Sequence, residues 1–163
     1  MPYVSVNGLD MYYEAHGDGS PLLLLHGGSG SIPEKWITLF TPRFRVIAPE
    51  QMGHGRTTDL VDRPYHYHDM AEDTVELMRQ LRIESAVVVG YSDGGIIGLD
   101  MAIHHPDRVT KLAVTGANAA STAIRRRIRS GHAASSPLAS PFRTTTYVFL
   151  PTARTTGLSF WPA

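Results

Sequence analysis

The pattern Gly90-x-Ser92-x-Gly94 places one serine between two glycines, and this spacing can support nucleophilic catalysis. Three consecutive valines precede the pattern and favour a buried strand, and the apolar residues that follow it favour a helix. A serine on such a sharp strand-to-helix turn has an exposed hydroxyl, and the glycines let the strand and helix backbones approach each other. The backbone N–H of Asp93 would then point from the helix N-terminus toward an oxyanion formed at Ser92. The alternative interpretation is a plain glycine turn that carries a surface serine.

The segments around this turn predict the architecture that would position the serine. We expect strands over residues 21–25, 44–49, 87–89 and 109–114, and helices over residues 32–40, 69–83 and 96–103. An Asn7-Gly8 turn predicts an antiparallel hairpin over residues 4–13. Strands that alternate with helices predict an α/β fold with a mostly parallel, doubly wound sheet led by this hairpin. Ligand sites in such sheets gather at the carboxyl ends of the strands, where we expect Ser92 and the run His26-Gly27-Gly28.

The composition predicts a globular core followed by a tail of different character. Hydrophobic residues make up 42% and charged residues 18% of the chain, and the absence of cysteine excludes disulfides and a thiolate site. No secretory signal is visible, so we expect a cytoplasmic location. Residues 1–120 hold all fifteen acidic residues, whereas residues 121–163 hold six arginines and no acid. We therefore expect a core at 1–120 and an atypical, partly disordered tail at 121–163, rich in Arg, Ser, Thr and Pro.

Five segments in this order make the chain resemble the N-terminal half of the α/β-hydrolase fold family, in its serine hydrolase branch. They are the hairpin, residues 22–28 (LLLLHGG), residues 53–57 (GHGRT), residues 88–95 (VVGYSDGG) and residues 105–109 (HPDRV). The fold that the resemblance implies is a truncated α/β-hydrolase core with an irregular C-terminal tail.

The resemblance also implies roles for the matched residues. Ser92 takes the place of the nucleophile, and the backbone N–H groups of Gly28 and Asp93 take the places of the oxyanion-hole donors. His26 takes a mostly structural role, beside the glycines of the site, Gly27, Gly90 and Gly94. The implied chemistry is transfer of an acyl group from a small ester or related substrate to water, through an acyl-enzyme.

The resemblance also implies a catalytic acid and a histidine later in the chain than the serine, in the order Ser, Asp or Glu, His. No acidic residue follows Asp107, and His132 is the only histidine after His105. No convincing strand precedes His132, so we interpret it as a solvent-exposed histidine, with a catalytic base as the alternative. The sequence therefore predicts a serine hydrolase with impaired turnover. The alternative is a catalytically inactive fragment or small-ligand-binding remnant of the fold.

We expect no cofactor, metal, nucleic-acid or membrane partner. His66 and His68 are two residues apart and do not share one helix face, so they do not predict a zinc pair. The arginines of Arg125–Arg129 lack interleaved aromatic residues, so we do not interpret them as a patch that binds nucleic acid or an acidic membrane. A shift in reading frame near residue 120 is our hypothesis for the change in composition. If the late strands are absent, the strand at 109–114 forms an exposed edge through which the chain could self-associate.

Overall fold

The computed structural model describes residues 2–117, 146–151 and 158–160. The helices are α1 (Glu34–Phe40), α2 (Tyr67–Gln80) and α3 (Asp93–His104). None of these helices is both long and apolar enough to cross a membrane. The strands are β1 (Tyr3–Val6), β2 (Leu9–His16), β3 (Ser20–Leu25), β4 (Phe44–Pro49), β5 (Ala86–Tyr91), β6 (Val109–Thr115), β7 (Thr146–Pro151) and β8 (Leu158–Phe160).

The elements predicted within residues 2–117 are confirmed, and their ends differ from the predicted ones by a few residues. His132 and Arg125–Arg129 lie outside the described residues. The expected boundary at residue 120 lies outside them too, so it stays a prediction.

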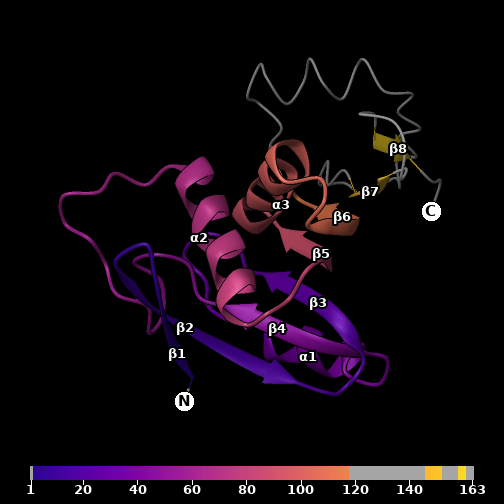
Figure 1. The fold of residues 1–163 in the computed structure, drawn as a ribbon, viewed down its shortest axis with the longest axis horizontal. Helices are drawn as coiled ribbons and strands as arrows, with labels where there is room; N and C mark the ends of the chain where they lie inside the picture. The colour runs from indigo at the N-terminus through magenta and orange to yellow at the C-terminus, as the bar shows by residue number, and fades with distance from the viewer. Residues whose placement is uncertain (1, 118–145, 152–157, 161–163) are drawn as a thin grey trace.

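All the strands belong to one eight-stranded sheet with the order β1-β2-β4-β3-β5-β6-β7-β8 (Figure 1). The central strands β4, β3, β5 and β6 are parallel to one another. The β1–β2 hairpin joins them through an antiparallel pair with β4. Its Asn7 and Gly8 have φ angles of 47° and 87°, which is the left-handed pair that a type I′ turn requires. The predicted α/β fold, with a parallel centre led by an antiparallel hairpin, is therefore confirmed.

Helices cover both faces of the central strands. The side chains of β3 show this, because they alternate between two apolar clusters that contain different helices. Leu23 and Leu25 pack in the cluster that includes the buried side chains of α2 and α3. Leu22 and Leu24 pack in the other cluster, with Ile37 of α1. Alternate residues of a strand point to opposite faces, so α2 and α3 lie on one face of the sheet and α1 on the other (Figure 1).

The strand β6 is not the edge of the sheet. It pairs with β7 in antiparallel register, from Leu112 opposite Phe149 to Thr115 opposite Thr146, and β7 pairs in turn with β8. An exposed edge at 109–114 was expected only if the late strands were absent, and this condition is not met, because the outer side of β6 is paired with β7. Self-association of the chain stays a prediction.

Candidate active site

Ser92 lies between β5 and α3 in a backbone conformation that few residues other than glycine adopt. Its φ is 52° and its ψ is −116°. Its N–H donates a hydrogen bond to the Thr115 carbonyl over 2.9 Å, which ties the turn to the end of β6. Ser92 is the N-cap residue of α3, yet its side chain makes no capping hydrogen bond. The strained turn thus carries a hydroxyl that the helix end does not use.

Glycines allow the backbone segments around Ser92 to come close together. A Cβ atom on Gly90 would lie 2.7 Å from the backbone nitrogen of Gly95, and one on Gly94 would overlap carbonyl groups at the end of β3. A Cβ atom on Gly27 would lie 3.1 Å from the Cβ of Ser92. The loops that follow β3 and β5 therefore meet at the carboxyl ends of these strands, and only glycine fits at their contacts.

His26 braces the loop that follows β3. The residue is buried, its Nε2 accepts a hydrogen bond from the Gln51 N–H over 3.0 Å, and its Nδ1 donates to the Gly27 carbonyl over 2.8 Å. Burial lowers the pKa of this imidazole below its usual value, so the ring is neutral near pH 7. Both ring nitrogens are engaged by backbone groups. His26 therefore joins two glycine-rich loops and has no nitrogen left to act as a base.

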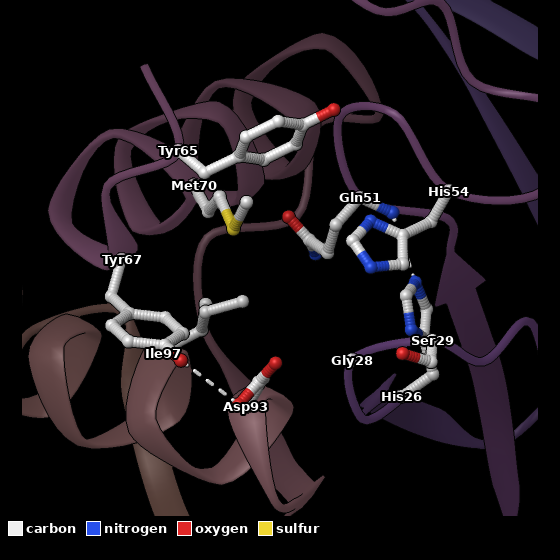
Figure 2. Close-up of a pocket in the computed structure, with 10 residues that line it drawn as sticks. All are labelled: His26, Gly28, Ser29, Gln51, His54, Tyr65, Tyr67, Met70, Asp93 and Ile97. Atoms are coloured by element: carbon white, nitrogen blue, oxygen red, sulfur yellow. Dashed lines mark hydrogen bonds between the residues drawn. The ribbon is translucent and has the colours of Figure 1, made fainter.

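Asp93 brings a carboxylate to the site as well as a backbone N–H. Its Oδ1 accepts a hydrogen bond from the Tyr67 hydroxyl over 2.9 Å (Figure 2). Burial and this hydrogen bond both raise the pKa of Tyr67. The other carboxylate oxygen lies against Gly28, where any Cβ atom would overlap it. Sequence reasoning considered only the N–H of Asp93, because the place of its side chain depends on α2, which is distant in sequence.

A cavity of about 300 Å³ opens beside Gly28 and Asp93, on the side of α2. Figure 2 shows side chains from several separate segments converging on it. Ser92 is not among the lining residues, so the cavity lies beside the predicted nucleophile rather than beneath it. The lining consists of His26, Gly28, Ser29, Gln51, His54, Tyr65, Tyr67, Met70, Asp93 and Ile97.

Gln51 places a buried acceptor in the wall of this cavity. Its side-chain amide donates to Thr74 Oγ1 over 3.3 Å, whereas its Oε1 has no hydrogen-bond partner among the described residues. The Thr74 hydroxyl donates its own proton to the Met70 carbonyl over 2.8 Å, so it can only accept from Gln51. This fixes the orientation of the amide. Sequence reasoning missed Gln51 and the residues of α2 that face it, because no local pattern marks them.

Within residues 2–117, no imidazole is hydrogen-bonded to the Ser92 hydroxyl. His54 lines the cavity, but its Nδ1 donates to the Met52 carbonyl over 2.9 Å and so braces its own loop. His68 and His104 are hydrogen-bonded to a carboxylate of α3 instead. The described part of the chain therefore combines a strained serine turn with a cavity, and no described imidazole is hydrogen-bonded to the serine.

Comparisons with known proteins place this arrangement in a family. A model of the alpha/beta hydrolase fold matches residues 20–162. A putative carbamate hydrolase, RutD of Azorhizobium caulinodans, is 33% identical over 129 residues, which are 78% of this chain and 48% of RutD. The serine hydrolase BPHL of Mus musculus is 35% identical over 136 residues, which are 78% of this chain and 46% of BPHL.

Solved structures of hydrolases are also similar to this chain. An N-acyl homoserine lactone degrading enzyme, Est816, superposes with a TM-score of 0.65 at 30% identity, over 71% of this chain and 45% of Est816. An enol-lactonase from Burkholderia xenovorans superposes with a TM-score of 0.64 at 27% identity, over 68% and 45% of the two chains. The chain thus spans about half the length of the curated relatives that it matches. It belongs to the α/β-hydrolase fold family.

Proposed function

We propose that this chain is a serine hydrolase that acts on a small ester or related acyl compound through an acyl-enzyme at Ser92. The observation that carries the proposal is the turn itself. Ser92 has a φ of 52° between a strand and a helix, and its hydroxyl makes no capping hydrogen bond. Strained backbone at such a turn is a recurring property of functional sites.

The proposed chemistry uses three groups of the described chain. The Ser92 Oγ forms a bond to the substrate carbonyl carbon while its proton passes to water, because no described imidazole is bonded to the serine, and the carbonyl oxygen takes up negative charge. The N–H groups of Gly28 and Asp93 donate to that oxygen. The carbonyl re-forms as the alcohol or amine departs with a proton, which leaves the acyl group on Ser92. Water then adds to the acyl carbon, and the acid and free serine are released.

The names of the relatives support an acyl substrate without selecting one. They include a putative carbamate hydrolase, an enzyme that degrades an N-acyl homoserine lactone, and an enol-lactonase. Carbamates and lactones both contain a carbonyl group bonded to a leaving heteroatom. We therefore propose a carbamate, lactone or related acyl compound that is small enough for the cavity of about 300 Å³ beside Gly28.

The second candidate function is a catalytically inactive or small-ligand-binding remnant of the fold. The observation that favours it is the absence, within residues 2–117, of an imidazole bonded to Ser92. In serine hydrolases, loss of the base costs about six orders of magnitude in kcat and leaves a rate of roughly 10³–10⁴ over water. We therefore propose that the turnover of this chain is impaired.

Hydrolysis of p-nitrophenyl acetate separates the two candidates. If Ser92 attacks the ester, we expect the wild type and Ser5→Ala to hydrolyse it at the same rate and faster than Ser92→Ala. The rate of Ser92→Ala then measures the floor of roughly 10³–10⁴ over water that binding and the oxyanion hole leave without the serine. Ser5 is an exposed residue of β1 and serves as the matched control. Equal rates for the wild type and Ser92→Ala would support the inactive or ligand-binding remnant. A wild-type rate typical of complete serine hydrolases would contradict the proposed impairment.

A further inference from the structure

A cluster of three side chains joins α2 to α3 on the outer surface of the molecule, apart from the cavity. His68 lies in the first turn of α2, and Asp100 and His104 lie four residues apart on α3. Asp100 Oδ1 accepts hydrogen bonds from His68 Nδ1 over 2.9 Å and from His104 Nδ1 over 3.0 Å. The two imidazole rings meet edge to face, with their centroids 4.8 Å apart. Two imidazole nitrogens, one from each helix, and a carboxylate oxygen of α3 therefore lie close together, and each of these atoms could bind a metal ion.

The donor set and its spacing suit a divalent transition metal. One ligand atom from each of the three residues lies within 4.8 Å of the other two. In a tetrahedral site, ligands about 2.0–2.2 Å from a zinc ion lie roughly 3.3–3.6 Å apart, so the two hydrogen-bonded pairs, at 2.9 and 3.0 Å, need to open by about half an ångström. The ligand nitrogens of His68 and His104 lie within 4.8 Å of each other and need to come closer, a movement open to these two exposed side chains. Imidazole favours Zn²⁺, Cu²⁺ and Ni²⁺ over Mg²⁺ and Ca²⁺, which prefer all-oxygen sites.

A neighbouring carboxylate is in place to orient one of the imidazoles. Glu72 Oε1 lies 3.9 Å from His68 Nε2, the nitrogen that faces away from Asp100. Glu72 is itself held by a hydrogen bond of 2.6 Å from His105 Nε2. Histidines that bind a metal commonly donate their second N–H to a carboxylate, which fixes the ring. Glu72 thus lies beside the cluster, and a small side-chain movement would bring it within hydrogen-bond distance of His68 Nε2.

We propose that His68, Asp100 and His104 form a binding site for a divalent transition metal ion such as Zn²⁺, which clips α2 to α3. Binding replaces the two Nδ1 protons, and each imidazole then carries its proton on Nε2. The sequence prediction of no metal site considered histidines along one helix only. It could not foresee a site built from one residue of α2 and an i, i+4 pair of α3.

A metal ion at this site would also stabilise the position of Tyr67, which lines the cavity. Tyr67 directly precedes His68, and its hydroxyl donates to Asp93 beside Gly28. A metal bound at His68 holds the start of α2 against α3. The proposal itself does not depend on the proposed hydrolase activity, because it rests on surface residues outside the cavity.

Calorimetric titration of the untagged, metal-free chain with ZnCl₂ tests this site. We expect one Zn²⁺ per chain, a Zn²⁺-dependent rise in Tm, and no heat with MgCl₂. Asp100→Asn and His104→Ala should each abolish the Tm rise. Glu72→Gln should weaken Zn²⁺ binding by about 10-fold or more, as is usual for an outer carboxylate. Circular dichroism of each variant checks that the chain is folded.

The matched control is His66→Ala, which removes an exposed histidine two residues from His68 and outside the cluster. We expect this variant to bind Zn²⁺ like the wild type. The proposal is overturned by a wild type that does not bind Zn²⁺ at millimolar concentration. Equal affinity in the wild type, Asp100→Asn and His104→Ala would also overturn it, as would a loss in His66→Ala as large as that in His104→Ala.

Discussion

At the scale of the residue, Ser92 has a backbone conformation that costs stability. A non-glycine residue in such a region costs of order 1–3 kcal/mol, and glycine removes this strain at an entropic cost of roughly 0.5–1 kcal/mol. We therefore predict that Ser92→Gly is more stable than Ser92→Ala by about 1 kcal/mol, because both lose the hydroxyl but only glycine relieves the φ of 52°. Urea unfolding of the two variants measures the difference. A Ser92→Gly chain no more stable than Ser92→Ala would show that the turn is not strained.

Single residues also mark the limit of what the sequence could predict. The glycines around Ser92 were predictable, because the G-x-S-x-G spacing is local and its backbone demands are general. The carboxylate of Asp93 against Gly28 and the unpartnered carbonyl of Gln51 were not. Each depends on a partner in α2, namely Tyr67 or Thr74, and no short-range pattern encodes that contact.

At the scale of the element, a buried carboxylate holds the loop that follows β4. Glu50 is 1% exposed and accepts hydrogen bonds from the Arg56 N–H over 2.6 Å and from the Arg56 guanidinium over 2.8 Å. Burial alone would raise the pKa of Glu50, but the hydrogen bonds from Arg56 outweigh it and lower the pKa below its usual value. The pair thus closes the loop that carries Gln51 and His54 into the cavity.

This loop predicts a pH dependence of stability. Because the pKa of Glu50 is lowered in the folded state, its contribution is complete above the unfolded pKa of about 4.3 and is lost as pH falls through the folded value. We predict that Glu50→Gln lowers the free energy of unfolding by about 1–3 kcal/mol at pH 7, and that this difference from the wild type shrinks below about pH 4. Urea unfolding from pH 3 to 7 measures it, with the exposed Glu84→Gln as control. A difference that stays constant down to pH 3 would contradict the role of the ionised carboxylate.

The elements themselves were largely predictable, since strands and helices of this fold have distinct apolar periods. The run Leu22–Leu25 predicted a strand buried on both faces, and β3 lies between two parallel neighbours. The partner of β6 on its outer side was not predictable in the same way. Pairing of β6 with β7 joins residues more than thirty positions apart in the chain, and alternation along either strand does not reveal such a partner.

At the scale of the whole molecule, the chain has the α/β-hydrolase fold and spans about half the length of its curated relatives. The family match runs to residue 162, beyond the predicted core. Within residues 2–117 the geometry supplies a serine on a strained turn, adjacent glycines and a cavity. These residues thus supply a hydroxyl on a strained turn, whereas no described imidazole is bonded to it to accept its proton.

Covalent labelling by a fluorophosphonate, read by mass spectrometry of the intact chain and its peptides, tests this account most directly. A phosphonyl group transferred to a serine reports whether the folded structure makes that oxygen reactive. The account predicts one slow adduct per chain on Ser92, lost in Ser92→Ala, retained in Ser5→Ala and lost on denaturation in urea. No adduct on Ser92, or labelling as fast in the unfolded chain as in the folded one, would contradict the claim that this turn carries a nucleophile.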